Sequence, residues 1–322
     1  MSWTRVSEFN VEKPADDANA TDPVAPPGQI VLLSVNPRAG ARSGAERVAE
    51  LESALADMGM VTERHTDIQT IAERAQTYFD DGRLHTVVAA GGDGTVSLVL
   101  SNSPLGVPLA ILPLGTENLL AKYYQLIIPP DRLAEYICAG RTVSVDVGRA
   151  NGRLFLLMVG IGFDAQVVLE VDRRRTGHIY KWSYFKPILA AMRTYQYPAM
   201  RIRIDEESFS DPVCWAFVAN VPRYAGGLSI VPQAIATDGL LDLCTLRRGR
   251  FWPGIKYLAA VAVRRHARLR DCQMKRAKRL RIEPVDETTV PFQLDGDPGG
   301  NLPVDIEVLP GRLRLVVAGS GP

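Results

Sequence analysis

The chain has 322 residues, of which 46% are hydrophobic and 23% are charged, and its formal net charge at pH 7 is +1. This length and composition are typical of a soluble globular protein with two domains. Because the charge is nearly balanced, nothing draws the whole chain to nucleic acid or to a membrane, and any anionic partner must be recognised by a local cluster. Residues 1–28 have no apolar core of a signal peptide, and no run reaches the roughly 18 apolar residues of a membrane span. We therefore expect a cytoplasmic protein.

Residues 1–28 are rich in Asp, Asn, Ala and Pro and are predicted to be a disordered tail. From residue 29 to residue 143, short apolar runs alternate with segments of helical period. Strands are predicted at Ile30–Val35, Val61–His65, Leu84–Ala89 and Leu109–Leu112, and helices at Gly44–Met58, at Ile68–Phe79 and from Val96 onwards. This βαβ repetition predicts an α/β nucleotide-binding domain built on a doubly wound parallel sheet with right-handed crossovers.

After residue 143 short alternating runs dominate, and they predict a second, β-rich domain over residues 144–322. The predicted strands are Val143–Val147, Arg153–Val159, Met200–Ile204, Cys214–Ala219, Leu240–Leu246, Arg279–Ile282, Val290–Leu294, Val304–Val308 and Leu313–Val317. Helices are predicted at Trp182–Tyr195 and Pro253–Arg265. The pattern is typical of an antiparallel sandwich, and it leaves open a return of the last strands to the first domain.

The four cysteines and four histidines are scattered along the chain. Cys138, Cys214, Cys244 and Cys272 form no C-x-x-C pair, which argues against a zinc site or a thioredoxin-like redox site. We expect them to be free, buried thiols, since free Cys packs as a small hydrophobic side chain. A histidine metal cluster is not expected either.

The most informative stretch of the chain follows the third predicted strand. Gly91, Gly92, Asp93, Gly94 and Thr95 lie between that strand and the helix after it. A glycine-rich turn at the start of a helix presents backbone N–H groups to an anion, and glycine lets the backbone approach a phosphate closely. Because the Asp93 carboxylate would repel bare phosphate, it indicates Mg²⁺ or a polar nucleotide group between them. The stretch predicts a nucleotide-using phosphotransferase.

Two further strand-to-helix loops, Asn36–Gly44 and Pro113–Asn118, are rich in turn residues. Loops of this kind emerge together at the carboxyl edge of a doubly wound sheet, where ligands bind. Ordinary turn and cap chemistry is the alternative for each loop alone. Neither a P-loop nor a G-x-G-x-x-G fingerprint is present.

As a set, the motifs closely resemble the diacylglycerol kinase catalytic-domain family, which includes bacterial lipid kinases, sphingosine kinases and ceramide kinase. The resemblance extends from Ile30 to Val317 and implies a fold of the NAD kinase and diacylglycerol kinase type. It rests on Gly91–Thr95, Pro113–Asn118, Asp146–Gly148, Gly160–Ala165, Tyr224–Gly227, Asp238–Asp242 and Asp295–Asp297, which occur in the family's order.

The resemblance implies that ATP and Mg²⁺ bind between the two domains. The residues that match the family's nucleotide site are Asn36, Thr66, Gly91, Gly92, Asp93, Gly94, Thr95, Gly115, Thr116 and Asn118. The chain departs from the family at Leu119, where the bacterial pattern usually has an acidic residue, so this helix start is expected to be less polar.

The resemblance also implies a structural Mg²⁺ site in the loop before the strand Leu240–Leu246. The matching ligands are the Asp238 carboxylate and the main-chain carbonyls of Ile235 and Leu240. Mg²⁺ suits such a loop because it takes few protein oxygens and keeps several waters. An Asp-Gly turn before a strand, without metal, is the alternative.

The segment Asp295–Gly296–Asp297 aligns with an Asp-Gly-Glu pattern of the family, in which the Glu is the general base. The resemblance therefore implies that Asp297 is the catalytic base, together with Asp93 near the Mg²⁺ of the nucleotide. A base must come within about 3 Å of the proton it removes, directly or through a water. A plain hairpin turn is the alternative, since Asp-Gly is also a hairpin signal.

We thus expect an ATP- and Mg²⁺-dependent lipid kinase of phospholipid biosynthesis, whose product is a phosphorylated lipid such as phosphatidate or a sphingoid-base phosphate. The expected partners are the lipid substrate and the surface of a membrane. Nucleic acid is not expected as a partner, and the sequence leaves a homodimer open. Interspersed arginines suit anionic headgroups and occur at Arg173–Arg175 with Lys181 and between Arg264 and Arg281, and solvated faces of helices and strands are the alternative for both clusters. Two alternatives stay open, an NAD kinase-like phosphotransferase with a soluble substrate and a catalytically silent nucleotide- or lipid-binding module.

Overall fold

The computed structural model describes residues 29–318 except 38, 40, 174–191, 209–210 and 225–227. The first part of the chain forms β1 (Ile30–Val35), α1 (Ala41–Asp57), β2 (Val61–His65), α2 (Ile68–Asp80), β3 (Leu84–Gly91), α3 (Asp93–Ser101), β4 (Pro108–Pro113), α4 (Leu119–Tyr123) and α5 (Pro130–Ala139). The predicted tail lies outside the described residues, as do the tip of the Tyr224–Gly227 motif, the cluster at residues 174–181 and most of the predicted helix Trp182–Tyr195.

The second part contains β5 (Thr142–Ala150), β6 (Arg153–Phe155), β7 (Met158–Gly162), α6 (Phe163–Arg173), β8 (Met200–Ile204), β9 (Glu207–Ser208), β10 (Trp215–Ala219) and β11 (Leu241–Leu246). It continues with α8 (Phe251–Ala262), a short 3₁₀ turn at His266–Arg268, β12 (Cys272–Ala277), β13 (Arg279–Pro284), β14 (Pro291–Leu294), β15 (Asp297–Asn301) and β16 (Val304–Val316).

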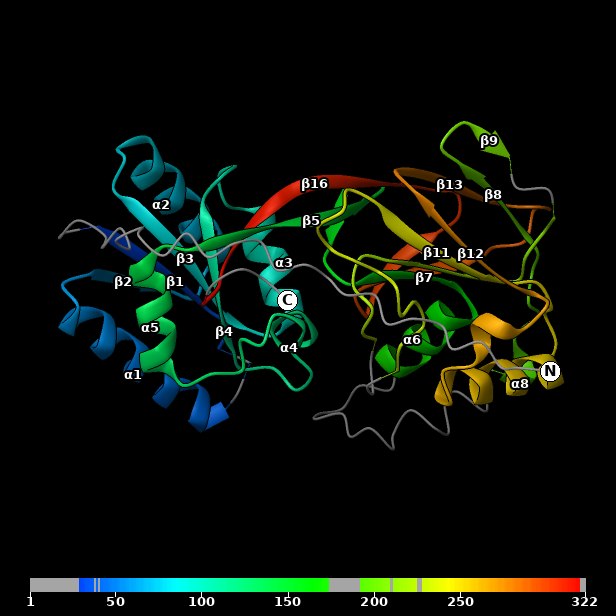
Figure 1. The fold of residues 1–322 in the computed structure, drawn as a ribbon, viewed down its shortest axis with the longest axis horizontal. Helices are drawn as coiled ribbons and strands as arrows, with labels where there is room; N and C mark the ends of the chain where they lie inside the picture. Colours follow the sequence, from blue (N-terminus) through cyan, green and yellow to red (C-terminus); the bar gives the residue numbers. More distant parts are fainter. Residues whose placement is uncertain are drawn as a thin grey trace, which may run out of the picture.

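The first domain has a parallel sheet between two layers of helices. Its strands lie in the order β2-β1-β3-β4 and pair in parallel. The strands β1, β3 and β4 are buried on both faces because helices cover both faces, whereas the edge strand β2 is polar and partly exposed. Ile71 of α2 and Val99 of α3 pack on one face, and Leu51 of α1 and Leu133 of α5 pack on the other. This confirms the predicted doubly wound α/β fold (Figure 1).

The second domain is an antiparallel β-sandwich, as predicted. One layer is the six-stranded sheet β12-β11-β10-β7-β14-β15, and the facing layer includes β13 and β8 beside the long β16. Side chains such as Ile161, Ile202, Leu280 and Phe292 fill the space between the layers. Helices α6 and α8 pack on the outer face of the six-stranded sheet, where Phe163, Trp215 and Tyr257 belong to one apolar cluster.

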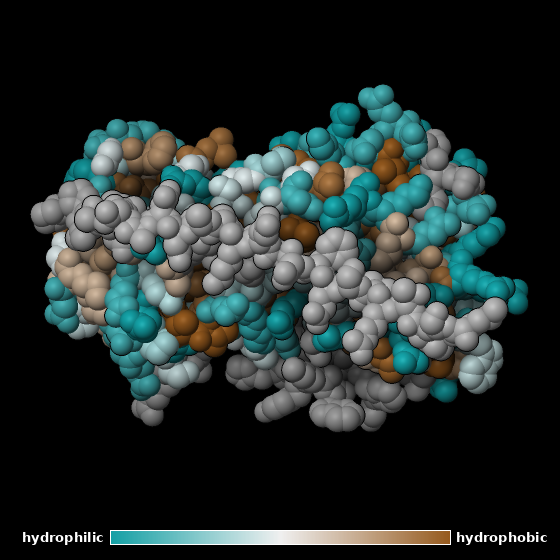
Figure 2. Space-filling model, in the orientation of Figure 1, coloured by the Kyte–Doolittle hydropathy of each residue, from teal (hydrophilic) through white to brown (hydrophobic). Residues whose placement is uncertain are grey.

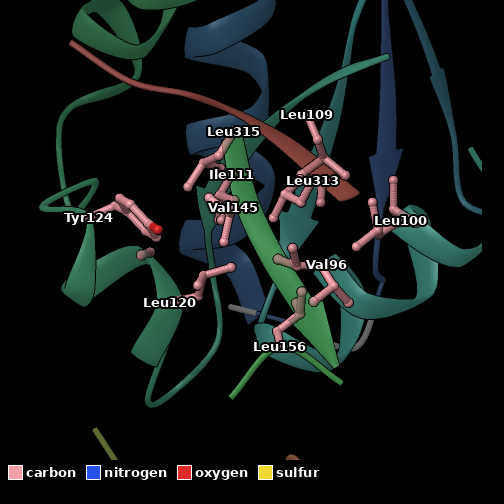
Figure 3. Packing of buried hydrophobic residues seen from close by; sticks show 14 of the residues in the cluster. Val96, Leu100, Leu109, Ile111, Leu120, Tyr124, Val145, Leu156, Leu313 and Leu315 are labelled. Atoms are coloured by element: carbon pink, nitrogen blue, oxygen red, sulfur yellow. The ribbon is translucent and has the colours of Figure 1, made fainter. Parts of the chain in front are cut away.

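Two long strands, β5 and β16, run from one domain into the other (Figure 1). Strand β16 pairs with β13 in the sandwich and, near its end, with β4 of the first domain in parallel. Figure 3 shows Leu313 and Leu315 of β16 and Val145 of β5 packed against Leu109 and Ile111 of β4. The last strand therefore completes the core of the first domain, and the two domains share one continuous sheet.

The two predicted strands Val304–Val308 and Leu313–Val317 form the single strand β16, with a register shift between Leu309 and Leu313. The shift accommodates Pro310, which has no N–H to donate, and Gly311, whose φ is +60°. Conversely, the predicted strand Arg153–Val159 is two strands, β6 and β7.

Gly148 of β5 lies directly under the ring of Phe155, its partner across the β5–β6 pair. An ideal Cβ at residue 148 would lie 1.9 Å from Cζ of Phe155, and Phe155 is fully buried. We expect Gly148→Ala to lower the free energy of unfolding by at least about 2 kcal/mol, since an overpacked core must displace the ring. Denaturant unfolding measures this change. Gly152→Ala serves as a comparison, because residue 152 has a positive φ but open space around it, so that substitution adds backbone strain without overpacking. Equal stability of Gly148→Ala and the parent chain would contradict the packing.

In the coloured part of the face shown in Figure 2, most residues are hydrophilic, and hydrophobic residues appear in small separate groups. Among the residues that the structure describes, no helix combines the length and the apolar character needed to cross a bilayer.

Candidate active site

Three loops at the carboxyl edge of the first sheet are joined by hydrogen bonds. The Asn36 amide N–H donates to the Ala90 carbonyl oxygen over 3.0 Å, and its side-chain Nδ2 donates to Thr95 Oγ1 over 3.1 Å. The Leu114 N–H donates to the Gly91 carbonyl oxygen over 2.9 Å. The loops after β1, β3 and β4 therefore form one surface, where the parallel strands end.

The stretch Gly91–Thr95, called the glycine loop from here on, and the loop after β4 are in contact through their backbones. A Cβ at Gly115 would lie 2.7 Å from Cα of Gly92, so a side chain at residue 115 would push the loops apart. Asn118, with φ +47°, folds its side chain onto Gly115, whose N–H donates to Oδ1 over 3.1 Å and whose carbonyl oxygen accepts from Nδ2 over 2.6 Å. Gly115 and Asn118 thus fix the conformation of the loop between β4 and α4 where it contacts the glycine loop.

Asp93, in the first turn of α3, reaches across to the start of α4. Its Oδ2 accepts from the Leu119 N–H over 2.8 Å, and its Oδ1 accepts from the Leu120 N–H over 3.0 Å. Burial raises the pKa of the Asp93 carboxyl, while these two N–H groups act in the opposite direction. The Asp93 carboxylate thus caps the first N–H groups of α4. The helix start is therefore paired with an acidic side chain, although residue 119 itself is the apolar Leu119 where the bacterial pattern is acidic.

Thr66 and Thr116 are exposed at the same edge. Thr66 follows β2, which is the neighbour of β1 in the sheet, and Thr116 lies in the loop between β4 and α4. Both residues are therefore on the side of the sheet where the other nucleotide-site candidates lie.

The Asp295–Gly296–Asp297 segment forms the tight turn of the β14–β15 hairpin. Leu294 and Asp297 are paired, and the two residues between them have φ angles of +52° and +93°. Two positive φ angles are typical of a type I′ turn, which suits the Asp-Gly dipeptide. The hairpin alternative is therefore correct for the backbone.

The same turn brings Asp297 to the glycine loop of the other domain. A Cβ at Gly94 would lie 3.9 Å from Oδ2 of Asp297. The Asp297 carboxylate thus faces the first turn of α3, which begins directly after the glycine-rich strand end. Two segments that are far apart in the sequence meet here across the domain boundary. The junction is open to solvent, since Gly94 and Asp297 are both exposed.

Asp295 is a half-buried anchor whose role the sequence did not indicate. Its Oδ2 accepts from the Leu156 N–H over 2.7 Å, and its Oδ1 accepts from the N–H groups of Leu157 and Met158 over 2.9 Å each. These bonds explain why the predicted strand Arg153–Val159 is interrupted, because the amides of Leu156 and Leu157 face a carboxylate instead of a neighbouring strand. Asp295 therefore attaches the turn to the loop between β6 and β7.

Burial raises the pKa of the Asp295 carboxyl from 3.8 to about 7, against the effect of the three N–H donors. Between these two values the folded protein holds a proton that the unfolded chain has released, so the stability from this group falls as the pH rises toward 7. We expect Asp295→Asn to be less stable than the parent near about pH 5, and the difference to shrink near about pH 8. Denaturant unfolding at both pH values tests this, and a difference that grows with pH would contradict it.

A second half-buried carboxylate, Asp164 in the first turn of α6, supports the same turn. Its Oδ1 accepts from the Tyr224 hydroxyl over 2.7 Å, and its Oδ2 accepts from Gln293 Nε2 over 2.9 Å. Gln293 Oε1 in turn accepts from the Gly296 N–H over 2.7 Å. Burial raises the pKa of the Asp164 carboxyl. The Gly160–Ala165 and Tyr224–Gly227 motifs are thus linked to the Asp297 turn by one chain of hydrogen bonds.

The loop before β11 is held by Asp146 of the Asp146–Gly148 motif. Asp146 Oδ2 accepts from the Gly239 N–H over 2.6 Å, and its Oδ1 accepts from the Gly311 N–H over 2.8 Å. Asp238 itself accepts from the Leu240 N–H over 3.1 Å and forms an ion pair of 3.2 Å with Arg276. Among the described residues, no group of three or more His, Cys, Asp or Glu side chains is arranged to hold a metal ion.

The cysteines depart in two ways from the sequence expectation. Only Cys244 is buried, whereas Cys138, Cys214 and Cys272 are partly exposed. The Sγ atoms of Cys244 and Cys272, on the paired strands β11 and β12, lie 3.8 Å apart. Sequence spacing could not indicate this contact, because it depends on the register between the two strands.

Comparisons with known proteins agree with this architecture. The model of the diacylglycerol kinase catalytic domain matches residues 30–150, and the model of the YegS C-terminal NAD kinase beta sandwich-like domain matches residues 157–317. The two models thus meet close to the boundary between the first domain and the sandwich.

A diacylglycerol kinase of Mycobacterium tuberculosis is 29% identical over 239 residues, which are 71% of this chain and 76% of that protein. The "Probable lipid kinase YegS" of Salmonella newport is 27% identical over 249 residues, which are 74% of this chain and 81% of that protein. The crystal structure of a diacylglycerol kinase from Bacillus anthracis has the same fold, with a TM-score of 0.66 and 20% identity over 91% of this chain and 98% of the other. The chain is therefore a kinase that belongs to the family of diacylglycerol kinase and YegS lipid kinases.

Proposed function

We propose that this protein transfers the terminal phosphoryl group of ATP, with Mg²⁺, to a hydroxyl group of a lipid. The observation that carries the proposal is the closeness of Gly94 and Asp297. A Cβ built on Gly94 would lie 3.9 Å from Oδ2 of Asp297. Phosphoryl transfer requires a phosphate-binding element and a group that positions the acceptor, placed next to each other and accessible from solvent. The junction between the two domains offers both.

The nucleotide phosphates are proposed to bind at the start of α3. The N-cap of α3 is Gly92, which has no side chain to occupy the first amides of the helix. The first N–H groups of a helix have no partner in a preceding turn and carry the positive end of its dipole, so they suit an anion. The neighbouring residues proposed to contact the nucleotide are Asn36, Thr66, Gly91, Thr95, Gly115, Thr116 and Asn118, all at or next to the carboxyl ends of the strands of this sheet.

On the acceptor side of the junction, Asp297 supplies the carboxylate that lies next to Gly94. We propose that the acceptor hydroxyl donates its proton to Oδ2 of Asp297 while its oxygen forms the new bond to phosphorus and the bond to ADP breaks. Asp295, Asp164 and Gln293 hold the turn of Asp297 in place.

The residues at the junction fit an Mg²⁺ ion that arrives with the nucleotide. Each Asp93 oxygen accepts one N–H and keeps a lone pair. Besides burial, the negative charge of Asp93 also raises the pKa of the Asp295 carboxyl, so the junction carries negative charge that a cation would offset. Mg²⁺ commonly binds one or two carboxylates together with substrate phosphates. When bound, the ion neutralises phosphate charge, and Asp93 would hold it while keeping α4 in position.

We propose a second Mg²⁺ site at Asp238, with the main-chain carbonyls of Ile235 and Leu240. Next to it, the Asp242 carboxylate is buried and neither of its oxygens has a hydrogen-bond partner among the described residues, so its negative charge is offset by an ion pair alone. Arg276 compensates part of this charge, since its guanidinium lies 3.2 Å from Asp238 and 3.5 Å from Asp242. The site thus fits a cation that competes with Arg276.

Mg²⁺ is therefore expected to raise the melting temperature of the parent chain, because a ligand that binds only the folded state stabilises it. Asp238→Asn should lose this response, and Arg276→Met should increase it, since the competing guanidinium is absent. Thermal unfolding with increasing Mg²⁺, against chelator, measures the effect. An unchanged Mg²⁺ response in Asp238→Asn would contradict the site.

The proposed reaction needs contact with lipid, so we also propose a cytoplasmic protein that associates peripherally with a membrane, without nucleic acid. A homodimer is not needed for the site, because every group proposed here comes from one chain.

The experiment that tests the proposal offers radiolabelled ATP and Mg²⁺ to the protein with diacylglycerol, ceramide, sphingosine or phosphatidylglycerol and, in a separate reaction, with NAD. Label in an organic-soluble product is expected with at least one lipid, and Asp297→Asn should not produce it. Label in a water-soluble dinucleotide from NAD would indicate the NAD kinase-like alternative, and no label in any product would indicate the silent binding module. Either of these results would overturn the proposal.

A further inference from the structure

Helix α8 has apolar residues on both of its faces, although it covers the outside of the sandwich. Gly254, Tyr257 and Val261 are buried against the sheet. On the opposite face Trp252 is 77% exposed, and Val263 at the C-cap is 63% exposed. Between them lie the exposed Lys256 and Ala259, at the i, i+4, i+7 and i+11 spacing that defines one face of a helix. Lys256 is the only charged residue between Phe251 and Ala262.

Positive charge lies beside this exposed apolar face. A pocket of about 720 Å³ beside α8 is lined by Arg247, Arg248, Lys256, Arg268, Leu269, Arg270 and Asp271. Arg247 pairs with Asp211 and Arg248 with Asp271, whereas the described residues provide no ion pair for Lys256, Arg268 or Arg270. The formal net charge of the whole chain is only +1, so this pocket is a local concentration of cations.

We infer that the exposed face of α8 and the adjoining basic pocket are the surface that docks on a bilayer containing anionic phospholipids. Cations alone would also suit a soluble phosphate, but a soluble anion does not explain the exposed Trp252 and Val263. Trp is favoured at membrane–water interfaces, and an apolar helix face bordered by cations binds in the plane of the interface. The pocket would receive the lipid phosphates while Trp252 and Val263 enter the apolar boundary.

This surface is connected to the proposed active site through the fold. Helices α6 and α8 cover the same face of the six-stranded sheet, and one apolar cluster extends from Phe251 and Ile255 of α8 to Phe163 of α6 and to Tyr224. The Tyr224 hydroxyl donates to Asp164, which is linked through Gln293 to the turn of Asp297. The inference rests on the proposed function, because a membrane-bound lipid must reach Asp297 from the side that docks.

The test is co-sedimentation of the full chain with vesicles of phosphatidylcholine, with or without phosphatidylglycerol. The parent chain is expected to sediment with the anionic vesicles. The triple variant Lys256→Gln, Arg268→Gln and Arg270→Gln should bind them about a hundredfold more weakly, at roughly fivefold for each cation. Trp252→Ala should bind them roughly tenfold more weakly. A matched control neutralises Arg64, Arg74 and Arg132 in the first domain, with the same change in net charge, and should bind as the parent does.

Equal binding by the parent and the α8 triple variant would overturn the inference, and so would an equal loss in the control variant. Undiminished binding by Trp252→Ala would also overturn it. The cations of the pocket would then account for vesicle binding by themselves, without insertion of the apolar face of α8. Kinase activity is measured separately with a short-chain lipid dispersed in detergent, where the α8 variants should match the parent. Failure of the proposed function would appear in that assay in the parent chain itself, whereas failure of the docking surface would appear only with vesicles.

Discussion

Asp297→Asn is expected to lower kcat by at least about a hundredfold, while the affinity for ATP stays close to that of the parent chain. The reason is that the amide occupies the same place in the β14–β15 turn but cannot accept the proton of the acceptor hydroxyl. Steady-state kinetics with the lipid found in the radiolabel assay gives kcat, and titration with a fluorescent ATP analogue gives the affinity. The fold should be unaffected, because Asp297 is exposed and its side chain lies at the surface of the junction.

Two variants serve as controls for this result. Asp297→Glu restores the residue of the family pattern and should keep a large part of the activity, since a carboxylate remains at the junction. Asp286→Asn changes an exposed carboxylate of the same domain, in the turn before β14, and should leave kcat unchanged. Turnover of Asp297→Asn at the level of the parent chain would exclude Asp297 as the base.

Gly94→Ala is expected to lower kcat/KM roughly tenfold to a hundredfold without loss of stability. Residue 94 is in the first turn of α3 and has no positive φ, so Ala fits the backbone and should stabilise the helix by up to about 0.5 kcal/mol. Its methyl group, however, would lie 3.9 Å from Oδ2 of Asp297, in the space proposed for the transferred phosphoryl group. A displacement of about 1 Å at a reacting centre is enough for an effect of this size.

Thermal unfolding and steady-state kinetics on the same sample separate the two effects of Gly94→Ala. Ser101→Ala, at the other end of α3 and exposed, is the matched control, because it also raises helix propensity but lies away from Asp297. It should leave kcat/KM unchanged. If Gly94→Ala retained full activity, the space between residue 94 and Asp297 could not be the reaction centre.

Much of the fold follows from periodicity in the sequence. The bounds of β1, β2 and β8 agree with the predicted runs, because those strands are short apolar or alternating segments with clear turn signals on both sides. Helix α6 was not predicted, since it begins directly after the glycines at residues 160 and 162 and has no separate turn before it. Strand β12 was not predicted either, because its exposed face is made of polar and charged residues.

The site was predictable where a motif contains the backbone signal itself, and less so where a buried side chain acts at a distance. The glycine loop and the Asp-Gly turn can be predicted from their own residues, because glycine and Asp-Gly favour these backbone conformations. By contrast, Asp146, Asp164 and Asp295 accept hydrogen bonds from groups that are 60 or more residues away in the sequence. No local pattern distinguishes such an anchor from an exposed aspartate, because its role depends on tertiary packing.

The glycine loop of the first domain and the Asp297 turn of the second are proposed to form one reaction centre. A crystal structure with Mg²⁺ and a non-hydrolysable ATP analogue tests it most directly. We expect the terminal phosphate to lie between the first amides of α3 and the Asp297 carboxylate. A nucleotide bound elsewhere, with Asp297 remote from its terminal phosphate, would contradict it.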